Sequence, residues 1–348
     1  MAPNEMPREC LDINFCHAAN ATGERHMSSF FNYFRVKILR ARPAVVLSVL
    51  LLACLFIPLF AAAEETATQQ LFPSPDAAVT ALVAASKADD MKTLSSILGQ
   101  DSDQILSSGD PVADNNARDD FVRRYQQMHR LEYDDQGRVI LYVGAENWPV
   151  PIPLVQKNGG WVFDAAAGKE ELLFRRVGRN ELFTIKVLED LADAQAEYAS
   201  EAHDGESAGQ FARKILSDTG KHNGLYWETT EGQPESPIGP LVASATAEGY
   251  KKDSSGNPIP FHGYYYKILT RQAKNAPGGA KNYLINGKMT NGFAFLAYPA
   301  EYRASGVTTF MINQDGIIVQ KDLGPDTAKL ASEIAQFNPD KTWQEVDE

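Results

Sequence analysis

Residues 261–324 decide the fold, because they read as strands separated by turns. Three runs carry the signal: FHGYYYKILTRQ (261–272), NYLINGKMTNGFAFLAYPAEY (282–302) and SGVTTFMINQDGIIVQKDLG (305–324). In the first run Tyr264 and Tyr266 share one face of the strand, and Tyr265 and Lys267 share the other. Asn-Gly and Asp-Gly pairs, which favour two-residue hairpin turns, punctuate the runs. The stretch therefore predicts an antiparallel meander.

A long helix is expected ahead of this meander, over residues 181–200. Gly178 interrupts the preceding pattern, and Ile185 and Leu188 then fall on one helical face. Residues 201–260 are rich in Gly, Pro, Ser and Asp, and they predict a long loop packed by its own apolar side chains. We expect the helix to pack across the meander.

The preceding part of the chain changes from a helical to a strand-like period. Ser74 opens the first of three expected helices, and Asp114 is expected to cap the third. Beyond His129 the period becomes two, and two Gly-containing turns predict successive hairpins. This arrangement resembles the NTF2-like (cystatin-like) cone. The expected fold class is α+β, with N-terminal helices packed on a curved antiparallel sheet, then a long helix packed on a C-terminal antiparallel meander.

The C-terminal part resembles the heads of type IV pilins and type II secretion pseudopilins. The likeness lies in GFAFLA (292–297), SGVTTF (305–310) and DGII (315–318), together with the long helix. A pilin continues that helix into a hydrophobic membrane segment, whereas here a whole soluble domain precedes it. We therefore do not expect this chain to polymerise as a pilin does.

The first 63 residues read as a signal peptide. Basic residues precede an apolar run at 44–60, and Ala61 and Ala63 satisfy the small-residue cleavage rule. The run is shorter than the ~20 residues of a membrane span, so no transmembrane span is expected in the mature chain. Met27 is an alternative start, which would make residues 1–26 a mis-called extension. Cys54 leaves lipoprotein anchoring as an alternative to cleavage.

The expected organisation is thus a signal peptide at residues 1–63 followed by two domains. Residues 64–177 form the NTF2-like α+β domain, and residues 178–348 form the pilin-head-like α+β domain. We expect the mature protein to be exported, to the periplasm or to the outside of the cell.

Composition excludes several classes of function. The chain has three cysteines, all before residue 64, so the mature chain has no disulfide, thiolate nucleophile or cysteine-ligated zinc. Removing residues 1–63 takes away 6 of 33 basic and 4 of 45 acidic residues, which leaves 27 against 41 and a net charge of −14. Such a surface repels phosphate backbones, so nucleic acid is not an expected partner.

No run has the spacing of a known catalytic or nucleotide-binding motif, so no catalytic residue is identified and neither a metal nor a cofactor is expected. Nine side chains are candidates for ligand binding: Asp110, Arg123, His129, Trp148, Asp164, Arg179, Glu181, His262 and Tyr264. Plainer roles stay open for several of them. Trp148 fits a core aromatic, His129 a favourable charge at a helix end, and His262 a strand start that bonds a loop carbonyl. Tyr264 fits either a stacking surface or a pin between helix and sheet.

Five short runs together carry a family resemblance: SSGDPVAD (107–114), WPVPIPLV (148–155), GRNEL (178–182), PFHGYYY (260–266) and QKDLGPDT (320–327). With them the chain resembles the bacterial exported family known as domain of unknown function 2950, over essentially the whole mature chain. The resemblance implies export and a shared fold. It implies no activity, so no catalytic residues carry over.

Three functions remain open. The expected one is a non-catalytic module that binds an envelope component or protein, through the mouth of the cone or the junction where Arg179, Glu181 and His262 are expected to meet. The first alternative is an envelope hydrolase in which Asp110 or Asp164 works with His262, which requires these groups to converge. The second is a structural subunit of a secretion or pilus-like assembly, which requires an exposed apolar patch on the long helix.

Overall fold

The computed structural model describes residues 69–346, apart from 101, 230–231, 233–234 and 252–258. These residues fall within one compact unit, Ala63–Glu348. The expected signal peptide, Met27 and Cys54 lie outside the described residues. Within the part of the chain that the structure describes, no helix is both long and apolar enough to cross a membrane.

Four described helices and a small antiparallel sheet form the first part of the fold, which agrees with the predicted α+β class. Three helices were predicted, and the additional one, α3, has only five residues. The helices are α1 (Pro75–Lys87), α2 (Met91–Leu98), α3 (Ser102–Leu106) and α4 (Pro111–Gln127). The strands are β1 (His129–Tyr133), β2 (Val139–Val143), β3 (Trp148–Pro149), β4 (Leu154–Lys157) and β5 (Gly160–Phe163). The sheet order is β1-β2-β4-β5, with β3 also paired to β2 and all pairs antiparallel.

The caps of these helices are partly those expected. The Ser74 hydroxyl accepts the Ala77 N–H at the start of α1, as predicted. The cap of α4 is Asp110, so the prediction of Asp114 at that position is wrong. The reason is Pro111, which suits the first helical position and moves the helix start four residues upstream.

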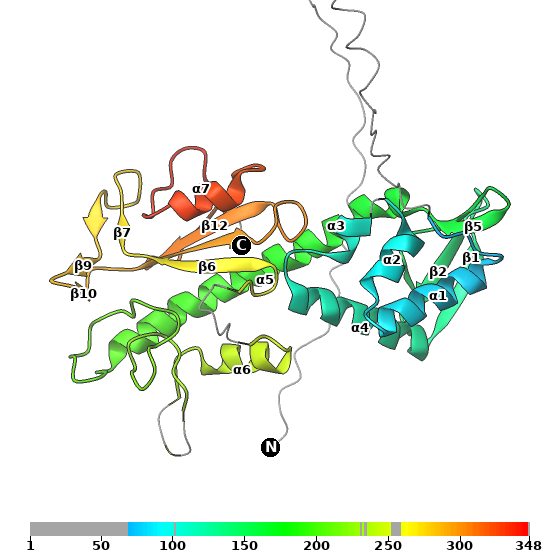
Figure 1. Cartoon of the computed structure of the whole chain (residues 1–348). Coiled ribbons are helices and arrows are strands. Elements are labelled where there is room, and N and C mark those ends of the chain that lie inside the picture. The colour runs from blue at the N-terminus through cyan, green and yellow to red at the C-terminus, as the bar shows by residue number, and fades with distance from the viewer. Residues whose placement is uncertain (1–68, 101, 230–231, 233–234, 252–258, 347–348) are drawn as a thin grey trace, which may run out of the picture. The chain divides into compact units, whose positions relative to one another are not determined.

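The long helix α5 (Ala165–Ser200) is continuous and begins earlier than expected (Figure 1). Its cap is Asp164, whose Oδ1 accepts the Ala167 N–H. The predicted start at residue 181 is wrong, because a glycine such as Gly178 inside a helix costs only about 1 kcal/mol, which packing overrides. Gly168 is needed for packing, since a Cβ there would lie 2.5 Å from the Pro151 carbonyl oxygen.

The expected antiparallel meander is present after α5 and a long connection that contains α6 (Gly239–Ala247). Its strands are β6 (Tyr264–Leu269), β11 (Ala294–Pro299), β12 (Thr308–Asn313), β13 (Ile318–Asp322) and β14 (Gln344–Glu345), in the order β14-β13-β12-β11-β6. Short strands lie between β6 and β11: β7 (Arg271–Gln272) pairs with β8 (Lys281–Asn282), and β9 (Leu284–Ile285) pairs with β10 (Lys288–Met289). Gln272 of β7 also forms a bridge with Phe337.

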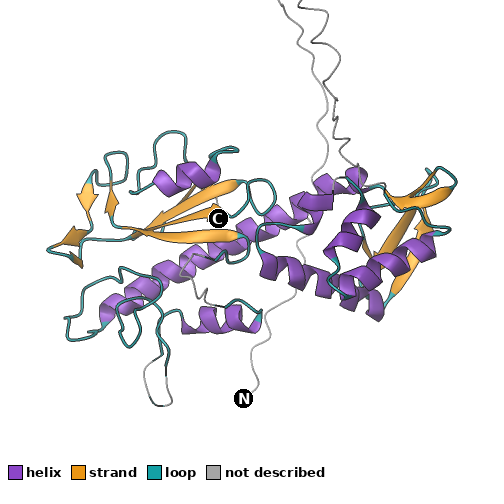
Figure 2. Cartoon of the chain, in the orientation of Figure 1, coloured by secondary structure: helices purple, strands orange, loops and turns teal. Residues whose placement is uncertain are grey.

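Helices cover both faces of this second sheet (Figures 1 and 2). On one face Tyr266 donates to Thr184 of α5 at 3.3 Å. On the other, Lys267 donates to the carbonyl oxygens of Ser332 and Ile334, at and just beyond the end of α7 (Thr327–Glu333). The alternation predicted for residues 264–267 is therefore confirmed.

The buried hydrophobic residues form two clusters. One draws on α1, α2 and the first sheet and includes Leu94, Leu141 and Phe163. The other draws on α5, the connection and the second sheet, and includes Leu225 and Phe295. The boundary between domains at residues 177 and 178 stays a prediction.

Candidate functional site

A buried carboxylate, that of Asp110, lies where several segments of the chain meet. Its Oδ1 accepts the backbone N–H groups of Val112 and Ala113 at the start of α4. Its Oδ2 accepts the Tyr250 hydroxyl and the Gly263 N–H, both at 2.8 Å. The side chain is fully buried. Four donors therefore converge on one carboxylate. It joins the start of α4 to Tyr250 and Gly263, which lie 140 and 153 residues further along the chain.

The segment that reaches Asp110 is a tight two-residue turn. His262 and Gly263 both have positive φ, 49° and 79°, and Phe261 and Tyr264 exchange backbone hydrogen bonds across them. This is the geometry of a hairpin turn in which both central residues are left-handed. A Cβ on Gly263 would lie 2.7 Å from Asn180 Nδ2 and 2.9 Å from Ser305 Cβ, so glycine is required for both backbone and space.

The side chain of His262 faces an acid and aromatic rings. Its Nε2 is buried and lies 2.7 Å from Glu248 Oε2, without the alignment of a hydrogen bond. Its ring centre lies 3.8 Å from that of Phe183. Burial lowers the pKa of His262, and the negative charges of Glu248 and Asp110 oppose that shift. The ring is therefore held towards its neutral form.

Helix α5 supplies a second set of contacts to the same region. Glu181 Oε1 accepts the N–H groups of Val307 and Thr308, both at 2.9 Å, and lies 3.5 Å from the Tyr264 hydroxyl. Burial raises the pKa of Tyr264, whose hydroxyl donates to the Thr308 carbonyl at 3.0 Å. Asn180 donates to the carbonyl of Ser305 at 2.9 Å. Glu181 and Tyr264 therefore pin the helix to the loop before β12.

Arg176 is the basic member of this region and was not among the sequence candidates. It donates to the carbonyl oxygens of Gln104, Ile105, Ser107 and Ala304. Burial lowers the pKa of Arg176, but a guanidinium stays charged at neutral pH. One signal pointed to it: Arg176, Asn180 and Thr184 recur every four residues, so polar side chains lie on the packed face of α5.

Five of the nine sequence candidates thus meet in one region, which we call the Asp110 clasp. It comprises Asp110, Arg176, Asn180, Glu181, Tyr250, His262, Gly263 and Tyr264, with Arg179 near enough for its charge to act on the pKa of His262. Tyr250 was missed because it lies in the irregular connection, where no periodicity marks it. Three of the runs that carry the family resemblance, 107–114, 178–182 and 260–266, contribute to the clasp.

The other four candidates do not join the clasp. Arg123 pairs with Asp120 on the surface of α4. His129 Nδ1 lies 3.0 Å from the Tyr125 carbonyl oxygen, and the two rings stack with centres 3.8 Å apart. Asp164 caps α5.

Trp148 is the fourth of these candidates. Its side chain is 44% exposed, so the interpretation as a core aromatic is wrong. The guanidinium carbons of Arg124 and Arg175 lie 5.4 and 5.2 Å from the centre of its ring. Each of these four candidates has its own local partner, and they do not line a common mouth.

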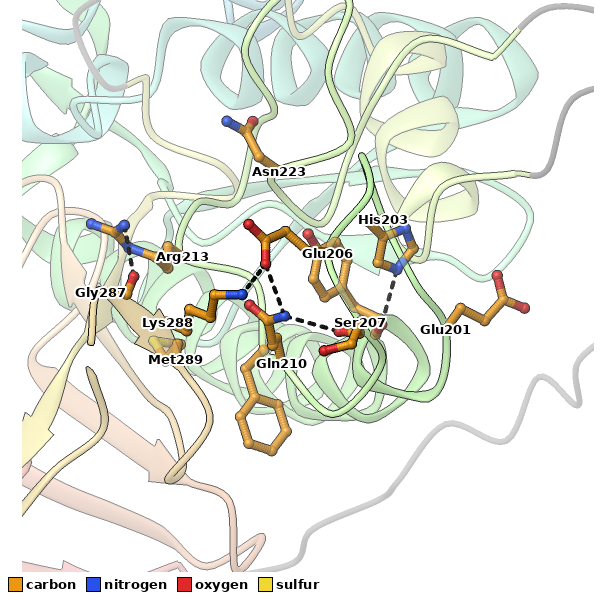
Figure 3. Close-up of a pocket in the computed structure, with 12 residues that line it drawn as sticks. Glu201, His203, Glu206, Ser207, Gln210, Arg213, Asn223, Gly287, Lys288 and Met289 are labelled. Atoms are coloured by element: carbon orange, nitrogen blue, oxygen red, sulfur yellow. Dashed lines mark hydrogen bonds and ion pairs between the residues drawn. The ribbon is translucent and has the colours of Figure 1, made fainter. Parts of the chain in front are cut away.

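A pocket of about 170 Å³ opens at the C-terminal end of α5 (Figure 3). Its wall has both polar and apolar surface, and its lining residues are Tyr198, Glu201, His203, Glu206, Ser207, Gln210, Phe211, Arg213, Asn223, Gly287, Lys288 and Met289. Lys288 pairs with Glu206 across it, and the Gln210 amide donates to the same carboxylate at 3.3 Å. The hydrogen bond from Lys288 lowers the pKa of Glu206.

Two tight turns shape this pocket. Residues 203–206 form a hairpin turn with positive φ at Asp204 and Gly205. The second is the Asn286-Gly287 turn between β9 and β10. The His203 ring stacks on Tyr198 with centres 4.0 Å apart, and its Nε2 lies 2.9 Å from the Tyr198 carbonyl oxygen. Among the described residues, no three His, Cys, Asp or Glu side chains group so as to hold a metal ion.

Comparison with known proteins identifies a family. The family model described as "Protein of unknown function (DUF2950)" matches residues 69–346. No curated protein and no solved structure matches the chain. The resemblances to NTF2-like domains and pilin heads are therefore not confirmed.

Proposed function

Since the chain belongs to the family described as "Protein of unknown function (DUF2950)", whose description names no activity, we propose that it is an exported, non-catalytic binding module of the cell envelope. Its binding site is the pocket at the end of α5, and its ligand is a small molecule that carries both charges, such as a free amino acid or a short peptide.

The observation that carries this proposal is the distribution of charge in the pocket. Lys288 and Arg213 provide cations, and Glu201 and Glu206 provide anions, around a pocket that also contains the aromatic side chain of Phe211. A zwitterion can replace the exposed pair between Lys288 and Glu206 with two pairs of its own. The pocket volume of about 170 Å³ suits a ligand of one or two residues.

The clasp supports a structural rather than a catalytic role for Asp110. A general base needs a free lone pair directed at a substrate proton, whereas this carboxylate already accepts four hydrogen bonds and is fully buried. Asp164, the other acid considered for a hydrolase, caps α5. These contacts favour a binding module over the envelope hydrolase.

Export is proposed from the sequence of the first 63 residues, and it is tested separately from binding. Cleavage after Ala63 predicts that the exported protein begins at Glu64. N-terminal sequencing of protein recovered from the periplasm or medium checks this start. A lipid-modified N-terminus at Cys54 would instead support the lipoprotein alternative, and retention of intact residues 1–63 in the cytoplasm would contradict export.

Binding is tested by native mass spectrometry and thermal shift of the purified protein with free amino acids and dipeptides. Lys288→Ala should weaken binding by about tenfold, because it removes one of the two charge contacts. Lys214→Ala is the matched control, since Lys214 forms an exposed pair with Asp218 outside the pocket. Absence of binding to every zwitterion, or equal effects of the two substitutions, would overturn the proposal.

A further inference from the structure

Two large apolar side chains stand exposed on α5. Phe174 is 76% exposed and Leu182 is 69% exposed. Among the other described large hydrophobic residues, only Tyr133 is similarly exposed, at 70%. They lie four residues before and four residues after Gly178, so all three fall on one face of the helix. Exposed apolar side chains grouped on one face mark an interaction surface more often than isolated ones do.

The centre of this face is open. A Cβ built on Gly178 would have no other atom within 4 Å, so nothing among the described residues covers the helix there. A glycine between two large side chains leaves a depression into which a facing helix can pack closely. The face therefore has the shape of a helix-packing surface, with Phe174 and Leu182 as its ridges.

The exposed side chains on either side of Gly178 would complement those of a second, antiparallel copy of α5. In an antiparallel pair of helices related by a two-fold axis at Gly178, Phe174 of one copy opposes Leu182 of the other. At the flanks of the face the same symmetry opposes Glu170 to Lys186, two exposed residues of opposite charge. In its own chain Lys186 pairs with Asp190 and lies 3.9 Å from Glu189. The exposed acid Glu170 of the second copy would add a further counter-charge.

We propose that α5 docks against α5 of a second copy of this chain, antiparallel and centred on Gly178. The apolar contact is made by Phe174 and Leu182, each twice by symmetry, and the Glu170–Lys186 pairs set the direction. This inference does not depend on the ligand pocket, which lies at the C-terminal end of α5, where Tyr198 lines it.

Self-association is measured by light scattering and analytical ultracentrifugation of the purified protein over a wide concentration range. We expect a monomer–dimer equilibrium that Phe174→Ala or Leu182→Ala weakens by about tenfold or more, since each substitution removes two buried side chains from a symmetric dimer. Tyr133→Ala is the matched control, because it removes an equally exposed aromatic ring from β1. A monomer at all concentrations, or a dimer that all three substitutions leave unchanged, would overturn the proposal.

The direction of the pair is tested with single cysteines, in a background where Cys10, Cys16 and Cys54 are replaced by serine. Gly178→Cys should form a disulfide-linked dimer. Phe174→Cys alone should not, because the two copies of that residue are separated by about 12 Å along the antiparallel helices. A dimer linked efficiently through Phe174→Cys would contradict the antiparallel arrangement.

The charge pairs provide an independent check. Lys186→Glu should weaken the dimer by several-fold, and Glu170→Lys in the same chain should restore it, because the exchanged charges again face each other. A double variant no stronger than Lys186→Glu alone would contradict the register.

Discussion

Asp110→Ala removes the common acceptor of four hydrogen bonds, and its effect on stability can be worked from the contacts. Loss of the helix cap at Val112 and Ala113 costs about 1 kcal/mol. The Gly263 N–H and the Tyr250 hydroxyl proton lose their buried acceptor, at about 1–3 kcal/mol each. The expected loss in the free energy of unfolding is therefore about 3–7 kcal/mol, a large part of the total stability of a typical domain.

The control is Asp164→Ala, the same chemical change at another helix cap. Among the described backbone N–H groups, the Asp164 carboxylate accepts only that of Ala167. Removing this carboxylate should therefore cost only about 1 kcal/mol. The assay is equilibrium unfolding in urea, followed by circular dichroism and extrapolated to water. If Asp110→Ala lowers the free energy of unfolding no more than Asp164→Ala, the structural role assigned to Asp110 is refuted.

Two further predictions concern the turn that Asp110 holds. Gly263→Ala should destabilise by about 2–4 kcal/mol, because it adds a steric clash to the left-handed strain. Gly316→Ala, at a positive φ with open space around it, should cost only about 1 kcal/mol in the same unfolding assay, and equal losses would contradict the reasoning. Burial lowers the pKa of His262; the charge of Arg179 adds to this shift and that of Glu248 opposes it. At a pH just below the ordinary histidine pKa of 6.5, the folded state therefore binds fewer protons than the unfolded state. Stability should fall as the pH falls from about 7 through this window, and His262→Asn, which tolerates the positive φ, should flatten that dependence. The same slope in both proteins would be evidence against a partly buried, neutral imidazole.

The meander could be predicted from the sequence because it depends on local patterns. The alternation in residues 264–267 and the Asp-Gly turn at residues 315–316 were enough for the meander, because period and turn chemistry fix a hairpin within a few residues. The start of α5 was not predictable in the same way. Gly178 read as a break, yet the cap at Asp164 and the packing of Gly168 against Pro151 hold the helix together upstream of it.

The clasp shows a similar limit. Asp110 and His262 were identified as polar side chains of interest, but their roles depend on Tyr250, which is 140 residues from Asp110 in the sequence. Nothing periodic marks a tyrosine in an irregular connection, so its pairing with a buried carboxylate is a property of the folded chain alone. The exposure of Trp148 was missed for the converse reason. An aromatic residue in a strand is usually buried, whereas here the ring is exposed and lies near two arginine guanidinium groups.

The continuity of α5 has a consequence for how the length of this chain can change. The helix supplies Ala165 to one buried cluster and Val187 and Leu188 to the other. Each residue of a helix advances it by about 1.5 Å and turns it by about 100°, so one residue inserted between residues 168 and 184 would rotate one packed face away from its cluster while the other stayed in place. Insertions of about seven or eleven residues bring both packed faces back to their clusters. Loops elsewhere can lengthen one residue at a time, whereas this segment can change only in such steps.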